Sequence, residues 1–447
     1  MPLPGAEREI TLRKFGYILA VTAAAVLPVI ALVALPSLAI LAGVVVLAAW
    51  LAVTRTGHQS WSATRVGIAT IPQRLGSSSV VVVGIAGVVG VLVAMLAMAE
   101  GFRSTLQQTG SDDTAIVLRA GSQTEINSVV DSDTTHIVTE EPQVMRDAGG
   151  RAVASPEIVV DASIPKKGST LDANVEIRGV GPQVWELHPR LRITAGRRFT
   201  PGLRELVVGR NAAREFAHTS IGSKLDLNGD PWTVVGEFTA GDSHDSELWA
   251  DTNVVATTYH RGNSTSSVTV QLKSARLFDA FKAAITGNPQ LKLQVQTTRT
   301  YYNAQSEQLT KIIRILGTTV AVIMAIGAVF GALNTMYAAI ATRTREIATL
   351  RAIGFRGVPV VVSVLIETLL LALAGGAVGA GIAWALFDNY TASTLGANFS
   401  QVVFEFRVTP ALVASGLKWA LAIGFLGGLF PALRAAGMPV TDGLREL

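Results

Sequence analysis

The sequence predicts an α-helical integral membrane protein with six spans and one α+β domain outside the membrane. Hydrophobic residues make up 49% of the 447 residues and charged residues only 16%, whereas a soluble domain carries about 25% charged residues. The apolar residues gather in long uncharged runs near both ends, while the middle of the chain is polar. This composition excludes a disordered chain, which needs low hydrophobicity and high charge.

The absence of cysteine narrows the possible chemistry. Because the chain has no cysteine, a disulfide framework, a CxxC zinc site and a cysteine nucleophile are excluded. The net charge of +4 is compatible with a nucleic-acid partner. However, the basic residues cluster beside the apolar runs, as they do on the cytoplasmic side of membrane proteins. We therefore expect contact with membrane lipids and no nucleic acid.

The first apolar run predicts a transmembrane hairpin. No residue from 16 to 54 is charged, and one helix of that length would span about 58 Å, about twice the hydrocarbon core. We therefore predict two spans over 16–54, with Pro36-Ser37 at the tip because proline interrupts a helix. A signal peptide is the alternative, and the length of the run disfavours it. Basic residues flank the run on both sides: Arg8, Arg13 and Lys14 before it and Arg55 after it. Both ends of the hairpin, and the N-terminal segment 1–15, are therefore expected in the cytoplasm.

The remaining segments complete the predicted topology. Residues 61–76 have the pattern of an amphipathic helix that lies on the cytoplasmic surface as an elbow, with a plain linker as the alternative. Spans are predicted at 78–99, 312–340, 358–387 and 410–433. The basic segment 341–357 and the C-terminus, 434–447, then belong to the cytoplasm, and 388–409 is an outer loop. The protein is expected in the inner (plasma) membrane, with the domain 100–310 on the periplasmic side.

The domain 100–310 shows the features of a mixed α+β fold. Short β-rich runs alternate with turn residues, and Asn228-Gly229 has the composition of a tight hairpin turn. An amphipathic helix is predicted over 275–286. Strands are predicted at 115–119, 205–209, 224–228, 232–236 and 291–296.

The sequence contains no familiar catalytic motif. No GxxxxGK[ST] loop, GxGxxG turn, GxSxG elbow or HExxH helix occurs, so the chain itself is not expected to be an enzyme or to bind a nucleotide. The densest polar cluster is Asp242, His244, Asp245 and Glu247. These residue types suit a divalent metal, but a solvated loop with Gly241 at its turn is the simpler interpretation. We therefore predict no metal site.

The basic segment after residue 340 has helical periodicity. Ile340, Ile347, Leu350 and Ile353 recur near helical spacing, and charged residues occupy the other positions. One interpretation is a loop that only sets topology. The other is a short helix that docks on a cytoplasmic partner. The charged residues concerned are Arg343, Arg345, Glu346 and Arg351.

Small and charged residues inside the late spans suggest packing contacts. Glycines four residues apart allow helices to approach closely, either within one chain or across a dimer face. The three pairs are Gly327 and Gly331, Gly375 and Gly379, and Gly424 and Gly428. Glu367 lies within a span, which makes it a functional candidate. A structural contact, with Asn334 or Lys418 as its partner, is preferred to a proton relay.

Several motifs resemble one known family. The segments 344–355 (TREIATLRAIGF), 374–379 (AGGAVG) and 430–437 (FPALRAAG), with Glu367 between the first two, resemble the MacB/FtsX-type ABC transporter permeases. Residues 192–199, 207–209 and 221–225 are similar to the MacB-like periplasmic core. The resemblance runs from about residue 60 to the end. It is strongest to DevC-like permeases, whose ATPase is a separate polypeptide. The predicted hairpin 16–54 departs from the four-span core of that family.

The resemblance implies a function for the chain. It implies a homodimeric permease that transmits ATP-driven movements of a separate ABC ATPase to the periplasmic domain, and so drives export. ATP and Mg would be bound by the ATPase, and no cofactor by this chain. A periplasmic membrane-fusion adaptor and an outer-membrane channel are further implied partners. The ATPase-coupling residues would be Arg343, Arg345, Glu346, Leu350, Arg351, Ile353 and Gly354. The alternatives are an FtsX-like regulator of a cell-wall hydrolase and a lipoprotein-releasing permease.

Overall fold

The structure is a computed structural model that describes residues 33–169, 171–288, 291–396, 398 and 400–439. The chain divides into two compact units. We call the first the helical unit; it comprises residues up to Ala97, Arg314–Asp388 and residues from Val408. We call the second the mixed unit; it comprises Met98–Ile313 and Asn389–Arg407. Each is described by itself.

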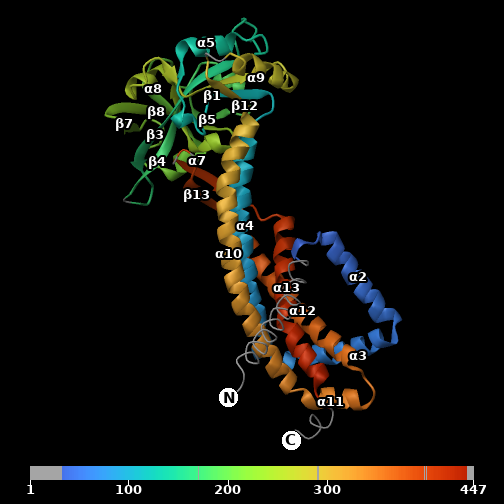
Figure 1. Cartoon of the computed structure of the whole chain (residues 1–447). Helices are drawn as coiled ribbons and strands as arrows, with labels where there is room; N and C mark the ends of the chain where they lie inside the picture. Colours follow the sequence, from blue (N-terminus) through green and yellow to red (C-terminus); the bar gives the residue numbers. More distant parts are fainter. Residues whose placement is uncertain (1–32, 170, 289–290, 397, 399, 440–447) are drawn as a thin grey trace, which may run out of the picture. The chain divides into compact units, whose positions relative to one another are not determined.

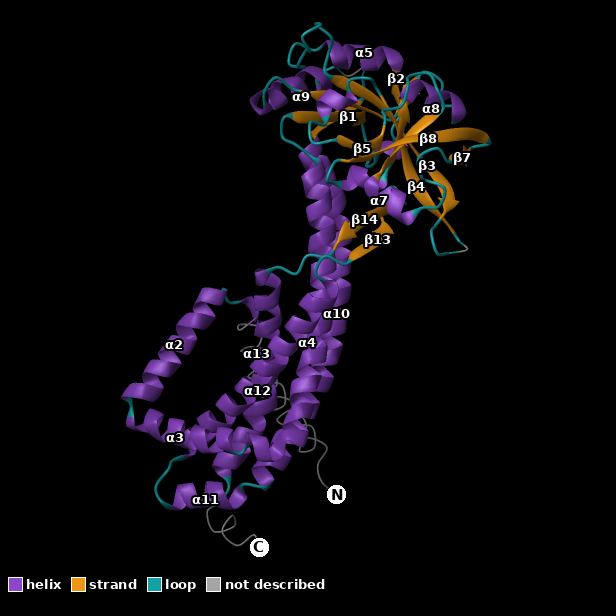
Figure 2. Ribbon diagram, turned by 180° about the vertical axis from the view of Figure 1, so that it is seen from behind, coloured by secondary structure: helices purple, strands orange, loops and turns teal. Residues whose placement is uncertain are grey.

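The long helices account for most of the predicted spans. The helices outside the sheet region are α2 (Ser37–Val53), α3 (Arg55–Ala69), a 3₁₀ turn η1 (Ile71–Arg74), α4 (Leu75–Thr109), α10 (Thr298–Ala341), α11 (Thr344–Ala352), α12 (Gly357–Phe387) and α13 (Pro410–Gly437) (Figures 1 and 2). Among the described residues, four of them are long and apolar enough to cross a membrane: α4, α10, α12 and α13.

The predicted number of six spans is not reached in the described part of the chain. The first predicted span runs from residue 16 to the tip at Pro36-Ser37, and its part at 16–32 lies outside the described residues; the start of α2 after Pro36 agrees with the predicted tip. The helices α2 and α3 count as a fifth span only if they are taken together, and they bend by 100°. Thr54 causes the bend, because its backbone is extended and its Oγ1 accepts from the Gly57 amide at 2.8 Å, which starts a new helix.

Two helices extend about ten residues or more beyond the predicted spans. Helix α4 continues past residue 99 to Thr109, and α10 begins at Thr298. Charged residues such as Glu100 and Arg103 end the apolar segment, but the helix continues through them. Gly110 follows the last residue of α4 and lies against the backbone of α10. A Cβ on Gly110 would lie 2.4 Å from Arg299 Cα, so this close approach needs a glycine. The helix and its apolar, membrane-spanning part therefore end at different residues.

The core of the helical unit lies where α4, α10, α12 and α13 meet. Buried aliphatic side chains fill it, among them Ile85, Val89, Leu371 and Ile423. Helix α3 packs on α12 through small residues. Its buried positions are Gly57, Ser60, Ala63, Thr64 and Gly67. The segment predicted as an elbow at 61–76 is therefore the second half of a helix that starts at Arg55, followed by a 3₁₀ turn containing Pro72.

The mixed unit is built around a ten-stranded sheet with the order β12-β1-β11-β3-β4-β9-β6-β8-β5, in which β7 also pairs with β8. The β4–β9 and β6–β8 pairs are parallel and the other pairs are antiparallel. The strands are β1 (Thr114–Arg119), β2 (Val130–Asp131), β3 (Ala154–Pro165), β4 (Asp172–Val180), β5 (Arg192–Gly196), β6 (Glu205–Gly209), β7 (Lys224–Leu227), β8 (Asp230–Thr239), β9 (Leu248–Asp251), β10 (Ser264–Thr265), β11 (Ser267–Gln271) and β12 (Leu293–Thr297).

Short helices complete this unit. They are η2 (Glu125–Asn127), α5 (Ser132–Glu140), α6 (Val184–Leu187), α7 (Arg210–Glu215), η3 (Ser243–Ser246), α8 (Thr252–Thr258), η4 (Ala275–Leu277) and α9 (Phe278–Thr286). All five predicted strands and the predicted helix over 275–286 are present. Asn228 and Gly229 both have positive φ, 56° and 85°, as a type I′ turn requires.

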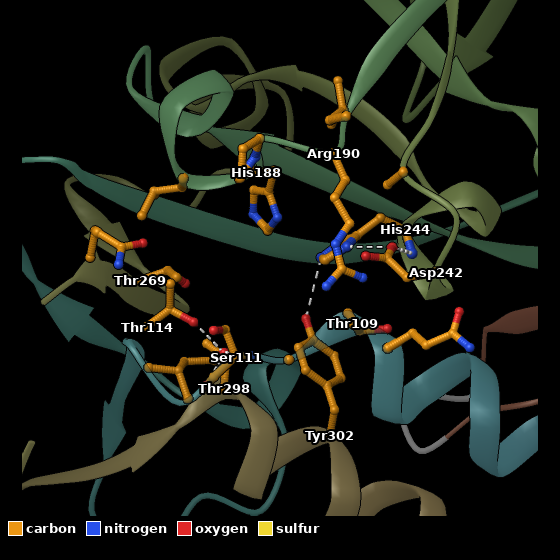
Figure 3. A pocket seen from close by; sticks show the side chains of 18 of the residues that line it. Thr109, Ser111, Thr114, His188, Arg190, Asp242, His244, Thr269, Thr298 and Tyr302 are labelled. Carbon is orange, nitrogen blue, oxygen red and sulfur yellow. Dashed lines mark hydrogen bonds and ion pairs between the residues drawn. The ribbon is translucent and has the colours of Figure 1, made fainter. Parts of the chain in front are cut away.

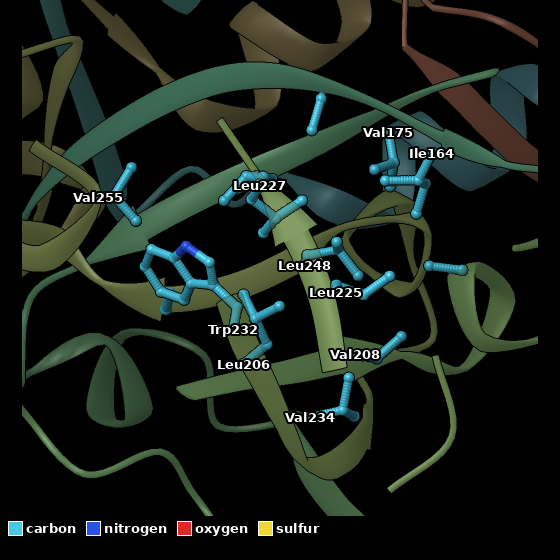
Figure 4. Packing of buried hydrophobic residues seen from close by; sticks show 14 of the residues in the cluster. Ile164, Val175, Leu206, Val208, Leu225, Leu227, Trp232, Val234, Leu248 and Val255 are labelled. Atoms are coloured by element: carbon cyan, nitrogen blue, oxygen red, sulfur yellow. The ribbon is translucent and has the colours of Figure 1, made fainter. Parts of the chain in front are cut away.

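Separate hydrophobic cores lie at the two ends of the sheet, which divide the mixed unit into two lobes. In the first lobe α5 and α9 cover β1, β11 and β12, and Phe281 and Ile285 are fully buried there. In the second lobe Trp232 and Leu248 pack against α7 and α8 (Figure 4). Strand β3 belongs to both lobes, because it pairs with β11 through its first residues and with β4 through the rest.

The predicted outer loop at 388–409 contains a β-hairpin that the sequence analysis missed. Strands β13 (Thr391–Leu395) and β14 (Gln401–Glu405) pair with each other and form no ladder with the large sheet. Phe404 packs edge-on against Phe102 of α4, with ring centroids 5.5 Å apart. The hairpin therefore belongs to the mixed unit, although it is far from that unit's other strands in the sequence.

Candidate coupling site and polar core of the mixed unit

Helix α11 forms in the basic segment that the sequence analysis singled out. Its buried side, with Ile347 and Ala348, packs against a small core that includes Met336 and Val364. Gly354 ends the helix with a φ of 107°. The amides of Gly354 and Phe355 donate to the carbonyls of Arg351 and Leu350, both at 3.1 Å, which is a Schellman ending. The structural role of Gly354 is therefore to stop α11.

Glu367 of α12 pairs with two arginines from distant parts of the chain. Arg343 Nη1, at the start of α11, donates to Glu367 Oε2 at 3.2 Å, and Arg74 Nη2 of η1 donates to Oε1 at 2.5 Å. The Glu367 side chain is only 4% exposed. Arg343 also donates to Glu346 at 3.0 Å. One carboxylate thus holds α12, α11 and η1 together.

The partners proposed for Glu367 from sequence were wrong. Lys418 donates instead to the carbonyl of Leu35 at 2.8 Å, and among the described residues no hydrogen bond joins Glu367 to Asn334. The reason is the register of α13 on α12, in which Gly424 and Gly428 lie against Thr368. Six residues separate Lys418 from Gly424, which is about 9 Å along a helix. Arg74 was missed because nothing local in sequence relates η1 to α12.

Gly67 of α3 lies directly over the Glu367 and Arg343 pair. A Cβ on Gly67 would be 2.8 Å from Glu367 Oε2 and 3.3 Å from Arg343 Nη1. No larger residue fits without displacing the carboxylate or the guanidinium. The close approach of α3 to α12 therefore depends on this glycine, a role that no sequence pattern indicated.

The other predicted coupling residues fall into two groups. Arg351 faces inward and donates to the Met438 carbonyl, and Leu350 is half-buried. Arg345, Glu346 and Ile353 are exposed, and the Ile353 side chain is 69% exposed. The structure thus brings Arg343 and Glu346 into the Glu367 network and leaves Arg345 and Ile353 on the free surface of α11.

The glycine pairs of the spans have different surroundings. A Cβ on Gly375 would lie 2.7 Å from the Val82 carbonyl oxygen, and one on Gly379 would lie 2.3 Å from that of Ala86. These two glycines therefore pack within the chain, as Gly424 and Gly428 do. Within the described residues, nothing lies within 4 Å of a Cβ added at Gly327 or Gly331 of α10. Of the three pairs, the α10 pair is thus the one that the described part of the chain leaves open to another molecule or to lipid.

The acidic cluster of the mixed unit is buried, which corrects the prediction of a solvated loop. Asp242, His244, Asp245 and Glu247 are each at most 8% exposed. His244 Nδ1 lies 2.9 Å from Asp242 Oδ1. Burial alone would lower the His244 pKa, but the carboxylates of Asp242 and Glu247 outweigh it and raise this pKa to about 9. Within the described residues, no group of these side chains has the arrangement of a metal site.

Glu247 belongs to a buried hub around Arg178 of β4. The Arg178 guanidinium contacts four carboxylates at 2.6 to 2.9 Å: Glu125, Glu157, Glu176 and Glu247. Burial, the largest effect, raises the pKa of Glu176 to about 8 and also raises the pKa of Glu157. For Glu247 burial acts in the same sense, but Arg178 and His244 outweigh it and lower the pKa.

This hub joins the two lobes and the β13–β14 hairpin. Glu125 lies on η2 of the first lobe and Glu247 just before β9 of the second. The Asn398 amide, between β13 and β14, donates to Glu176 Oε2 at 2.8 Å. The pattern of a single arginine and four scattered glutamates is invisible in sequence, because their positions run from 125 to 247.

Next to the hub lies a cavity of about 180 Å³. His188, Arg190, Asp242, His244 and Tyr302 line one part of it (Figure 3). Hydroxyl groups line another part: Thr109, Ser111, Thr114, Thr269 and Thr298. Burial, and next the charge on His244, lower the His188 pKa to about 3, so His188 is neutral at physiological pH.

Two family models match successive parts of the chain. Residues 78–288 match the model of the MacB-like periplasmic core domain. Residues 318–440 match the model of the FtsX-like permease C-terminal domain. The Arg178 hub, except for Asn398, lies in the first match, and Glu367 and α11 lie in the second.

The chain is also similar to individual ABC transporter proteins. The chain is 24% identical to the macrolide export ATP-binding/permease protein MacB of Photorhabdus laumondii over 81% of this chain and 57% of that protein. It is 23% identical to the uncharacterized ABC transporter permease YknZ of Bacillus subtilis over 85% of this chain and 98% of that protein. The chain thus spans about half the length of the MacB relatives it matches and almost all of YknZ.

Solved structures of two such extramembrane regions are also similar to part of the chain. The periplasmic region of MacB from Actinobacillus actinomycetemcomitans is 14% identical, with a TM-score of 0.33, over 42% of this chain and 90% of that one. The extracellular domain of YknZ from Gram-positive bacteria is 17% identical, with a TM-score of 0.32, over 41% of this chain and 100% of that one.

Proposed function

We propose that the chain is a transmembrane ABC permease of the MacB/FtsX type that couples ATP hydrolysis by a separate ATPase to movements of the mixed unit that drive export; the two family matches support this proposal. The membrane is the cytoplasmic (inner) membrane, both termini are cytoplasmic, and the mixed unit is periplasmic. The full-length match to a protein named as a permease supports a separate ATPase. ATP and Mg are bound by that partner.

The observation that carries this proposal is the attachment of α11 to the bundle through Glu367. The exposed side of α11 offers Arg345, Glu346 and Ile353 to a partner. Its other side is held by buried packing and by the Arg343–Glu367 ion pair. A displacement of α11 is therefore passed to α12 and, through Arg74, to the elbow that precedes α4. A flexible loop would dissipate such a displacement.

The permease is proposed to work as a homodimer through the open face of α10. Gly327 and Gly331 face no neighbour in the described chain, and large apolar side chains flank them, among them Ile323 and Phe330 at 65% and 67% exposed. Glycines at this spacing allow a second helix to approach closely. A periplasmic membrane-fusion adaptor and an outer-membrane channel are further proposed partners.

Charge reversal on the exposed face of α11 tests the proposal. The Arg345→Glu permease in membranes should lose the ATPase that copurifies with the wild-type protein, and stimulation of ATP hydrolysis should disappear. Arg65→Glu on the exposed side of α3 is the matched control and should retain both. Copurification of a peptidoglycan hydrolase in place of an adaptor would favour the regulatory alternative. An Arg345→Glu protein that still binds and stimulates the ATPase would refute the coupling role of this face.

A further inference from the structure

The cavity beside the Arg178 hub has the size of a site for a small metabolite. Its volume is about 180 Å³, close to the roughly 150 Å³ engineered cavity that holds one benzene molecule. Pockets for drug-sized compounds measure about 300–1,000 Å³. The cavity therefore suits a ligand of amino-acid size and is too small for a large exported compound.

Arg190 supplies a cation to this cavity that the chain itself does not use. It lies in the segment after α6 and reaches into the cavity (Figure 3). Within the described residues, the Arg190 side chain forms no ion pair and no hydrogen bond. A guanidinium presents paired N–H donors in a fixed geometry that matches a carboxylate.

Glu157 supplies the complementary group. Its side chain lines the cavity and is 3% exposed. Oε2 accepts from Arg178 Nη1 at 2.8 Å, but Oε1 is buried without a hydrogen-bond partner. A buried acceptor without a hydrogen bond is unfavourable, because it has lost its water without gaining a partner. A cationic donor at Oε1 would supply both the missing hydrogen bond and a favourable charge.

We propose that this cavity binds a small zwitterion of the free amino acid class. Its carboxylate binds Arg190 and its ammonium group binds Oε1 of Glu157. A simple anion fits less well, because the unsatisfied oxygen of Glu157 would repel it. A simple amine leaves Arg190 without a partner. Because the cavity lies between the two lobes, the ligand contacts both of them, which makes it an effector of the mixed unit that is distinct from the exported substrate.

Matched probes separate these possibilities. The purified full-length protein is titrated calorimetrically with glycine, L-alanine and L-serine, and with propionate and ethylammonium, which each lack one charged group of alanine. At least one amino acid should bind with a dissociation constant about tenfold or more below those of the two half-probes. No detectable binding of the three amino acids, or equal binding of propionate, would overturn the proposal.

Two variants locate the binding. Arg190→Ala, which changes an exposed residue without internal partners, should weaken amino acid binding about tenfold or more, and Arg190→Lys should restore part of it. Arg192→Ala, two residues further on and outside the cavity lining, should bind like the wild type. Glu157→Gln should weaken amino acid binding while leaving propionate binding unchanged. Unchanged amino acid affinity in Arg190→Ala would refute the site, whether or not Glu157→Gln folds.

Discussion

Arg343 at the start of α11 donates a hydrogen bond of 3.2 Å to Glu367, a residue 24 positions later and buried in α12. The contact joins the segment proposed to receive force to a helix of the bundle. Arg74 approaches the same carboxylate from η1. One acidic side chain is therefore shared by two cations from segments that are far apart in the sequence.

Removing one member of this network should destabilise the bundle. Glu367→Ala removes the buried carboxylate that Arg74 and Arg343 share, and loss of one partner of a buried pair costs at most about 3–5 kcal/mol. We expect a lower thermal midpoint in detergent. Arg345→Ala, which changes an exposed residue, should alter the free energy of unfolding by at most about 0.5 kcal/mol. Equal effects of the two substitutions would contradict the network.

The Arg343–Glu367 contact should also be visible as energetic coupling. In a double-mutant cycle of Arg343→Gln and Glu367→Gln, the two changes should be non-additive by about 0.5–3 kcal/mol. The measurement is thermal or denaturant unfolding of the four proteins. ATPase stimulation by the same four proteins then reports whether the contact transmits force. Additive stabilities would mean that the two side chains do not interact.

Substitution of Gly67 should disturb the same site from the side of α3. The methyl groups of Gly67→Val would occupy the space of the Glu367 carboxylate, since an added Cβ already lies 2.8 Å from it. We expect destabilisation of about 1–3 kcal/mol from overpacking and a loss of ATPase stimulation. Gly84→Ala is the control, because nothing lies within 4 Å of its added Cβ. Wild-type behaviour of Gly67→Val would show that α3 does not pack here.

The glycine pairs should separate folding from dimerisation. Gly379→Ala should destabilise the bundle, because its Cβ would lie 2.3 Å from the Ala86 carbonyl. Gly331→Leu, on the open face of α10, should leave the fold intact and weaken the proposed dimer. Disulfide crosslinking of Gly327→Cys in membranes measures the dimer, and thermal unfolding measures the fold. Crosslinking that Gly331→Leu leaves unchanged would place the dimer contact elsewhere.

The mixed unit should lose stability above neutral pH. The His244 pKa rises from 6.5 to about 9 on folding, because its carboxylate neighbours outweigh the opposing effect of burial. The folded state therefore binds the proton more tightly, and this stability is fully present below pH 6.5 and lost as the pH rises through about 9. Glu176 acts in the same direction, because burial raises its pKa from 4.5 to about 8.

Hydrogen exchange of residues 242–251 across this pH range measures the effect. After correction for the intrinsic exchange rate, protection should fall between pH 6.5 and 9, and His244→Gln should flatten the upper part of the profile. Asp251→Asn, at the start of α8 and outside the hub, is the control and should keep the wild-type slope. Protection that increases with pH would contradict the assigned charge states.

The sequence by itself determined the class of protein and most local structure. Apolar runs longer than a soluble helix needs, with basic flanks, identified the late spans, because the membrane imposes length and charge rules on individual segments. The helical spacing of apolar residues over 340–353 predicted α11, and Asn228-Gly229 predicted a hairpin turn. Both predictions were possible because turns and helix faces depend on residues that are close in sequence. The family resemblance rested on motifs of the same local kind.

Only the tertiary structure decided which distant charges meet. The partners of Glu367 are at positions 74 and 343, and those of Arg178 are spread from 125 to 247. A residue pattern does not reveal such pairings, because they depend on the register between helices and on strand order. For the same reason the sequence predicts a solvated loop at 242–247. In the structure the surrounding lobes bury these residues and shift the pKa values of their groups.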